Sequence, residues 1–315
     1  MFIYVLLFLI GCVLLYFGSE FLVDNSVILS RKFKISPIVI GATVVALGTS
    51  LPELLVSIYS IIFIDNSSSS SGLILGNVLG SNIANVSLVL GYCAFMYTII
   101  FENNFLKELL FIFCLGLYSI FCLYYEVTIN YMHGIILLLL FLYYLYNLIT
   151  NNKIDESSFI MEDSNLFYNI ILIILAIVAL AFGSHLVVDN ATKIADLLQF
   201  GSLAIGITIV ALGTSLPELF TGIVSIKKRN YNLLIGNIIG SNVINIVFVL
   251  GISSLMIDIK PSIELLGFTK LIYIGIVFIL SHLILILSNS FSKSISKVSG
   301  FILLLLYLFF LYKIF

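Results

Sequence analysis

Charged residues are scarce in this 315-residue sequence: Asp, Glu, Lys and Arg together make up 10%, whereas hydrophobic residues make up 61%. The mean hydropathy of +1.22 is higher than the core of a soluble domain requires. This composition excludes an ordinary soluble protein and predicts an all-α polytopic membrane protein. The net charge of −2 gives no sign of a nucleic-acid partner, and the lipid bilayer is the partner that the composition implies.

Cysteine is also sparse, and its residues are Cys12, Cys93, Cys114 and Cys122. They are scattered through apolar segments without the spacing of a metal or redox site, which favours small buried side chains. Neither His133 nor His282 has the spacing of a metal ligand, and no Ser/His, HExxH or paired-Asp constellation is visible. These absences argue against an intramembrane enzyme and against a prosthetic group.

Long apolar runs fill most of the chain. Ten of them reach the length of about 20 residues that a bilayer requires, and they cover 2–25, 36–64, 72–98, 105–124, 128–149, 167–191, 203–226, 232–256, 268–288 and 297–314. The joints between them are short and polar, and we expect the serine-rich segment 65–71 to be one of these loops.

The sequence repeats itself. GATVVALGTSLPEL at 41–54 recurs as GITIVALGTSLPEL at 206–219, and GNVLGSNIAN at 76–85 recurs as GNIIGSNVIN at 236–245. Five spans in each half would make the second half enter the bilayer upside down, as in many secondary transporters. We therefore expect a first five-helix repeat over 1–149, a cytoplasmic linker over 150–165 and a second, inverted five-helix repeat over 166–315.

The basic residues predict the orientation. With the N-terminus outside, ten of the 14 Lys and Arg residues fall in cytoplasmic joints and the other four fall outside. The positive-inside rule therefore predicts that the chain is N-out and C-out.

Each copy of the first motif carries a proline followed directly by a glutamate. Pro52 and Pro217 have no amide hydrogen, so each leaves a carbonyl of the preceding turn without its helical partner. In a bilayer, broken backbone persists only where it is buried in protein or lines a cavity. Glu53 and Glu218 place a carboxylate beside each break, and ionisable groups inside a span cost at least about 2.5–3.5 kcal/mol and indicate a functional site.

Neutral oxygen-bearing side chains accompany the two glutamates. Hydroxyl groups lie within about one helical turn of each carboxylate, and in the second motif a serine and an asparagine four residues apart share a helix face: Thr49, Ser50, Thr214, Ser215, Ser81, Asn85, Ser241 and Asn245. Together they form a hard, all-oxygen environment of the kind that Ca²⁺ prefers. A single GNxxGSN block is equally typical of a tightly packed helix face, but a duplicated Pro-Glu pair is much harder to explain structurally.

At these residues, ALGTSLPE at 46–53 and 211–218 with the two GNxxGSN blocks, the sequence resembles the cation/Ca²⁺ exchanger superfamily, specifically its prokaryotic Na⁺/Ca²⁺ exchanger branch. The resemblance covers essentially the whole chain. It implies a secondary active antiporter of a prokaryotic plasma (inner) membrane, which carries Na⁺ and Ca²⁺ by alternating access and has no required protein partner.

The resemblance also implies a ligand set near the midplane. Glu53 and Glu218 would bridge a central Ca²⁺ and share in Na⁺ binding, with Thr49 and Thr214 beside them as metal ligands. The remaining implied cation ligands are Ser50 and Ser215, the backbone carbonyls of Ala46 and Ala211, and the side chains of Ser81, Asn85, Ser241 and Asn245. Some relatives, including K⁺-dependent exchangers, have an acidic residue at the position of Asn245, so its neutral side chain argues against K⁺ co-transport.

Alternatives remain open at this point. Ca²⁺/H⁺ exchange on the same scaffold would let protons compete for Glu53 and Glu218, and a cation channel could use the same carboxylates as part of a selectivity ring. Four further polar residues occupy matched repeat positions toward helix ends, where a hydrated group is unremarkable, and we expect them to be structural: Glu20, His185, Asp24 and Asp189.

Overall fold

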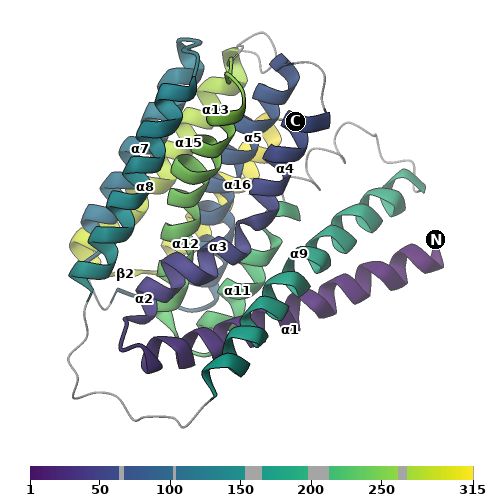
Figure 1. The fold of residues 1–315 in the computed structure, drawn as a ribbon, viewed down its shortest axis with the longest axis vertical. Helices are drawn as coiled ribbons and strands as arrows, with labels where there is room; N and C mark the ends of the chain where they lie inside the picture. Colours follow the sequence, from purple (N-terminus) through teal and green to yellow (C-terminus); the bar gives the residue numbers. More distant parts are fainter. Residues whose placement is uncertain (64–66, 102–103, 153–164, 198–212, 262–267, 315) are drawn as a thin grey trace.

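The computed structural model is almost wholly helical and describes residues 1–63, 67–101, 104–152, 165–197, 213–261 and 268–314 (Figure 1). In the first half the elements are α1 (Phe2–Lys32), α2 (Pro37–Ile40), a π-helical turn (Gly41–Val45), α3 (Ala46–Thr49), α4 (Leu51–Phe63), α5 (Ser67–Ala84), a π-helical turn (Asn85–Leu90), α6 (Gly91–Met96), β1 (Ile99–Ile100), α7 (Leu106–Tyr124) and α8 (Tyr131–Asn151). The second half contains α9 (Leu166–Leu197), α11 (Leu216–Lys227), α12 (Tyr231–Val243), a π-helical turn (Ile244–Val249), α13 (Leu250–Met256), α15 (Phe268–Leu287), a π-helical turn (Ser288–Ser292), β2 (Ser294–Ile295) and α16 (Lys297–Ile314).

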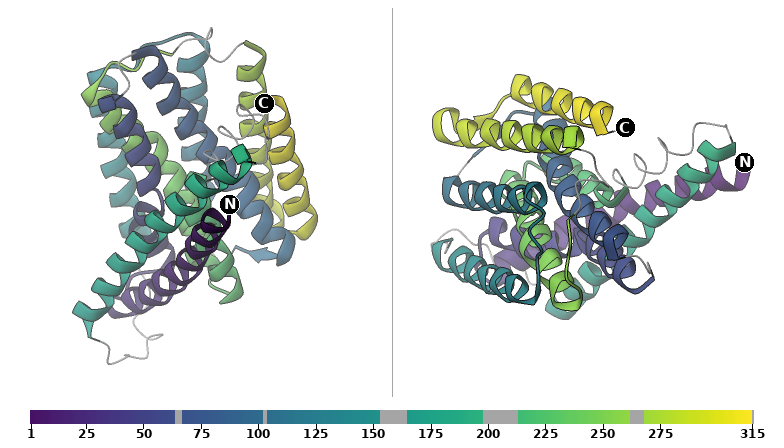
Figure 2. Two further views of the ribbon diagram at one scale, coloured as in Figure 1. Left: turned by 90° about the vertical axis from the view of Figure 1, so that its right-hand side faces the viewer. Right: turned by 90° about the horizontal axis from the view of Figure 1, so that it is seen from above.

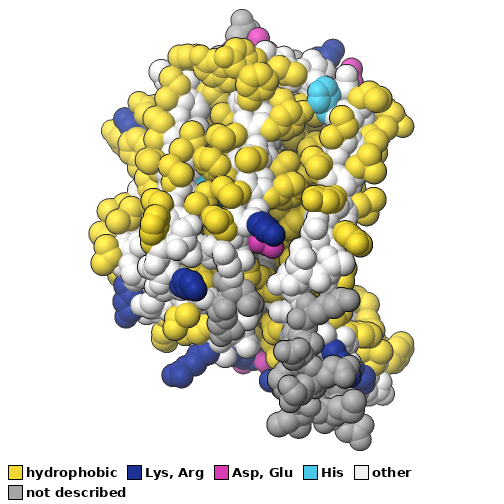
Figure 3. Space-filling model, turned by 90° about the vertical axis from the view of Figure 1, so that its left-hand side faces the viewer, with side chains coloured by type: hydrophobic (Ala, Val, Ile, Leu, Met, Phe, Trp, Pro, Cys, Tyr) yellow, Lys and Arg dark blue, Asp and Glu magenta, His cyan; other side chains and the backbone are white. Residues whose placement is uncertain are grey.

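The membrane-spanning character of the fold is confirmed. Among the described residues, eight helices are long and apolar enough to cross a bilayer, and the pair Pro37–Thr49 and Leu51–Phe63, bent by 41°, makes a ninth. These match nine of the ten predicted spans, while the first part of the remaining one, 203–226, lies outside the described residues. Hydrophobic side chains cover most of the face in Figure 3, as a lipid-facing surface requires.

The prediction of a loop over 65–71 is wrong for most of that segment. Helix α5 begins at Ser67, so the serine run forms its first turn instead of a connection. Serine is a poor residue for a helix interior but is favoured at a helix start, which makes the same composition typical of a loop or of a helix N-terminus.

Helices α1 and α9 form an oblique antiparallel pair along one side of the other helices (Figures 1 and 2). They meet at small residues: a Cβ on Gly11 would lie 2.9 Å from the carbonyl oxygen of Gly183, and a Cβ on Gly18 would lie 3.2 Å from that of Ala176. Lipid tails are as apolar as Leu, so membrane helices associate through such close backbone packing.

The helices with the GNxxGSN blocks lie at the centre of the protein. In their most apolar stretches, 72% of residues are buried in the span Ser70–Met96 and 94% in Tyr231–Met256, against 22% in α1 and α16. Each central span contains a π-helical turn, which begins at Asn85 in the first half and at Ile244 in the second. Such turns shift the side chains that follow around the helix and are frequent at functional sites.

Two short backbone pairings join the halves. Strand β1 pairs antiparallel with β2, so that Ile99 faces Ile295, and an isolated bridge joins Ile129 to Ile259 through hydrogen bonds of 2.9 and 3.0 Å. The first pairing lies before α7 and the second after it, and a helix of 19 residues is about 28 Å long at 1.5 Å per residue. The two connections therefore hold opposite ends of the helical bundle.

Candidate functional site

The two copies of the first motif break at the same serine. Ser50 has φ −88° and ψ 7°, and Ser215 has φ −87° and ψ 5°, which is the bridge region that terminates a regular helix. A new helix begins at the next residue in both copies, with Pro52 and Pro217 in its first turn, where a missing amide hydrogen costs nothing. Proline therefore fixes a break, as predicted from the sequence.

Each glutamate lies in the first turn of the helix that follows its break. Glu53 in α4 and Glu218 in α11 are both 0% exposed. The free amides of a helix N-terminus favour negative charge nearby, so the break places each carboxylate at the positive end of a helix dipole. None of the ion pairs among the described residues involves either glutamate.

Hydroxyl groups from both halves surround the Glu218 carboxylate. Ser50 Oγ donates to Glu218 Oε1 at 3.2 Å, and Ser241 Oγ donates to the same oxygen at 3.4 Å. Thr49 Oγ1 lies 3.4 Å from Ser241 Oγ and donates to Asn237 Oδ1 at 3.1 Å. The break of the first half therefore supplies hydroxyls to the glutamate of the second.

The Glu53 carboxylate also has hydroxyl groups nearby, but neither of its oxygens accepts a hydrogen bond. Ser81 and Thr214 are its neighbouring hydroxyls, although neither reaches hydrogen-bond geometry, and Glu218 is near enough to interact with it electrostatically. Buried polar atoms are normally hydrogen-bonded. Six buried oxygens of the predicted ligand residues have no protein hydrogen-bond partner, and five of them are carboxylate or amide oxygens that can only accept: Glu53 Oε1 and Oε2, Glu218 Oε2, Asn85 Oδ1, Asn245 Oδ1 and Ser215 Oγ.

The predicted ligand residues that the structure describes have buried side chains. Thr214 is the most exposed of them, at 8%. Ala46 is also buried, and its carbonyl oxygen accepts the Ser50 amide at 3.0 Å and the Thr49 hydroxyl at 3.4 Å. Ala211 lies outside the described residues.

Four asparagines of the GNxxGSN blocks belong to this polar region but were not among the predicted ligands. Asn77 Nδ2 donates to the backbone oxygen of Glu53 at 2.8 Å, and Asn237 accepts from Thr49. Asn82 and Asn242 contact each other across the two halves. Their presence at matched positions in both blocks was the signal that could have identified them.

The donor set limits the ions that fit. Among the described residues, no group of three or more His, Cys, Asp or Glu side chains could hold a metal ion. Two carboxylates with many neutral oxygens suit hard cations such as Na⁺ and Ca²⁺, whereas zinc and other transition metals favour nitrogen and sulfur ligands.

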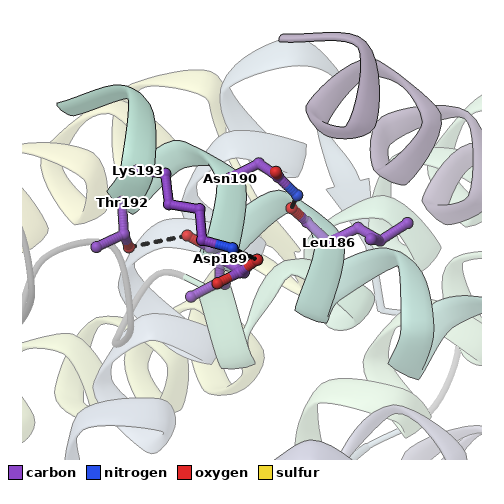
Figure 4. Close-up of polar contacts among 6 residues, drawn as sticks. Leu186, Asp189, Asn190, Thr192 and Lys193 are labelled. Atoms are coloured by element: carbon purple, nitrogen blue, oxygen red, sulfur yellow. Dashed lines mark hydrogen bonds and ion pairs between the residues drawn. The ribbon is translucent and has the colours of Figure 1, made fainter. Parts of the chain in front are cut away.

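The polar residues toward the ends of α1 and α9 lie outside this cluster. Asp189 forms an ion pair of 2.7 Å with Lys193 one turn along α9, as Figure 4 shows, and the Asp189 side chain is 41% exposed. Asp24 and Glu20 both face Lys228, at 2.5 and 3.8 Å. Exposed pairs of this kind contribute about 0–1 kcal/mol.

Comparisons with known proteins give the family. The family model described as "Sodium/calcium exchanger protein" matches residues 3–150 and 168–315. The chain is 34% identical to the uncharacterized membrane protein MJ0091 of Methanocaldococcus jannaschii over 96% of this chain and 94% of that one. It is 29% identical to the sodium/calcium exchanger MaX1 of Methanosarcina acetivorans, over 98% of both chains.

A solved structure of the sodium–calcium exchanger NCX_Mj has the same fold. The TM-score is 0.81 at 32% identity, covering 98% of this chain and 97% of that chain. The family and the fold indicate a transporter and not a catalytic enzyme, and the apolar helices and prokaryotic relatives support an integral protein of the plasma membrane. The matches confirm the resemblance seen in the two repeated motifs: the chain belongs to the sodium/calcium exchanger family.

Proposed function

We propose that this protein exchanges Na⁺ for Ca²⁺ across the membrane by alternating access, with Glu53 and Glu218 as shared cation ligands. The observation that carries the proposal is the pair of fully buried carboxylates, from equivalent positions, with three oxygens that no protein group satisfies. An unpaired buried charge is very costly, so such a pair persists where a cation compensates it. The similarity to MaX1 and NCX_Mj, both sodium/calcium exchangers, supports Na⁺ and Ca²⁺ as the two exchanged ions.

Two carboxylates also explain why the ions would exchange. The site has a formal charge of −2, which balances one Ca²⁺ or two Na⁺, and a third Na⁺ would make the loaded site positive. Because the same oxygens would hold both ions, Na⁺ and Ca²⁺ exclude each other from the shared position. Binding of one ion therefore promotes release of the other, which is the coupling that an antiporter needs.

The proposed ligand set is the one that the family resemblance implies, and the buried oxygens beside the two glutamates support it. Ca²⁺ takes six to eight oxygens, and two carboxylates alone provide at most four. The remainder would come from the hydroxyl, amide and backbone oxygens of Ala46, Thr49, Ser50, Ser81, Asn85, Ala211, Thr214, Ser215, Ser241 and Asn245. Thr49 and Thr214 would lie beside the two glutamates at the central Ca²⁺.

The proposed architecture has two inverted halves, 1–149 and 166–315, joined by a cytoplasmic linker over 150–165, with both termini outside. The two backbone pairings between the halves support the inversion. The segment after α6 is paired at one end of α7, through β1 and β2, and the corresponding segment after α13 is paired at the other end, through Ile259 and Ile129. Two inverted halves can exchange conformations, which would open the central site to one side and then to the other.

The test is uptake of ⁴⁵Ca²⁺ into proteoliposomes that contain the purified protein and internal Na⁺, at the same pH on both sides. An equimolar K⁺ interior serves as the control. Uptake that requires the outward Na⁺ gradient, and that is lost in Glu53→Gln and Glu218→Gln, is the expected result. Uptake that follows an imposed pH gradient alone would instead assign the protein to Ca²⁺/H⁺ exchange, and unitary currents in a bilayer would assign it to the channels.

A further inference from the structure

Four buried asparagines form a closed arrangement where the two GNxxGSN blocks meet. Asn85 Nδ2 donates to Asn242 Oδ1 at 3.0 Å, and Asn245 Nδ2 donates to Asn82 Oδ1 at 3.1 Å. All four side chains are at most 1% exposed. Each bond joins one half of the chain to the other, and the two bonds are equivalent under the repeat.

The backbone determines how Asn82 and Asn242 are turned. Asn82 Nδ2 donates to the backbone oxygen of Asn242 at 3.1 Å, and Asn242 Nδ2 donates to that of Asn82 at 3.5 Å. A carbonyl oxygen can only accept, so the amide nitrogen must be on the side of the backbone, and the amide oxygen must be on the other side. A flipped amide would bring two oxygens together.

The orientation of Asn82 and Asn242 determines the orientation of Asn245 and Asn85, the two asparagines of the proposed site. The oxygens of Asn82 and Asn242 can only accept, so Asn245 and Asn85 must each turn their nitrogen toward them. Their own oxygens are then directed elsewhere, and these are the buried Asn85 Oδ1 and Asn245 Oδ1 atoms that have no protein partner. A free amide of this kind could otherwise present either its nitrogen or its oxygen to a cation.

We infer that Asn82 and Asn242 are positioning residues, each of which fixes the site asparagine of the opposite half so that its oxygen, and not its nitrogen, is offered to the cation. The inference rests on the proposed cation site and adds residues that do not themselves need to touch the ion. The pairing is crossed: Asn82 acts on Asn245, although Asn85 lies only three residues away, and Asn242 acts on Asn85.

A double-mutant cycle on the full-length protein tests this crossed pairing. The readout is equilibrium ⁴⁵Ca²⁺ binding in Na⁺-free detergent solution, for Asn82→Ala, Asn245→Ala and the double variant. We expect Asn82→Ala to weaken Ca²⁺ binding about tenfold, and to add almost nothing once Asn245 is already alanine. The matched control cycle pairs Asn82→Ala with Asn85→Ala, and there the two losses should multiply to about a hundredfold.

Three results would overturn the inference. In the first, the Asn82 and Asn245 losses multiply; in the second, Asn82 couples to Asn85 as strongly as to Asn245. In the third, Asn82→Ala binds Ca²⁺ like the unmodified protein while Glu53→Gln abolishes binding, which leaves the proposed function intact. Unchanged binding in both glutamine variants would instead overturn the proposed function itself.

Thermal unfolding of the ion-free protein distinguishes this positioning role from a purely structural one. If Asn82 were only structural, Asn82→Ala would lower the unfolding temperature, but the Ca²⁺ affinities would not show the coupling between Asn82 and Asn245. If Asn82→Ala does not fold, the equivalent pair of the other half can be tested by a cycle of Asn242→Ala with Asn85→Ala. The control cycle then pairs Asn242→Ala with Asn245→Ala.

Discussion

Replacing Glu53 by glutamine should change stability in opposite directions with and without Ca²⁺. Both oxygens of the buried Glu53 carboxylate lack a hydrogen-bond partner, as do the amide oxygens of Asn85 and Asn245, which are also acceptors. A buried polar group left unsatisfied costs about 1–3 kcal/mol. Glutamine has the same shape, carries no charge and provides a donor, so the ion-free variant should gain about that amount and unfold roughly 2–6 °C higher.

Calcium should reverse this order. A ligand that is present at a hundred times its dissociation constant stabilises the native protein by about 2.7 kcal/mol, and Glu53→Gln should lose that increment with the ligand. The measurement is thermal unfolding of both proteins in detergent, without ions and over a Ca²⁺ titration. The two stabilities should cross as Ca²⁺ is added.

The matched control is Asp189→Asn, which also removes one carboxylate but at a position 41% exposed and paired with Lys193 on its own helix. It should change stability by no more than about 0.5 kcal/mol and keep the full Ca²⁺ shift. The reasoning would be refuted if the ion-free Glu53→Gln protein were less stable than the native one, or if it kept the native Ca²⁺ shift.

Three further substitutions probe the site and the helix contacts. Ser50→Ala removes a hydroxyl donor to the second-half glutamate and should weaken apparent Ca²⁺ affinity about fivefold in the uptake assay. Gly183→Ala brings a Cβ to 3.0 Å from a carbonyl oxygen of α1 and should cost about 1–3 kcal/mol in thermal unfolding, whereas Gly275→Ala, whose nearest neighbour would be at 3.8 Å, should not. Gly116→Ala would overlap the Phe278 ring and lower the unfolding temperature, and a second change, Phe278→Leu, should restore part of the loss.

Much of the site was evident from the sequence because its chemistry is local. A carboxylate next to a proline within an apolar run is unusual in itself, and its duplication at Glu53 and Glu218 excludes chance more firmly than either copy alone. The break at Ser50 also follows locally, since proline cannot donate and a helix must restart around it. The composition predicted the membrane and the repeat predicted which residues correspond.

Partners across the halves could not be predicted in this way. The hydroxyls were expected within about one helical turn of the glutamate of their own motif, but the helix ends between Thr49 and Glu53, and Ser50 donates to Glu218 of the other half. The serine run at the start of α5 was ambiguous for a related reason, because helix starts and loops favour the same residues.

The sequence by itself therefore determined the membrane class, the repeated blocks and the two carboxylates, because composition and local backbone chemistry are properties of short segments. Only the tertiary structure decided which oxygens meet, and it brought Asn82 to Asn245 from the other half of the chain. Such contacts depend on how two helices cross and on where a π-helical turn shifts the side chains. Neither property is encoded in the spacing of residues along one helix.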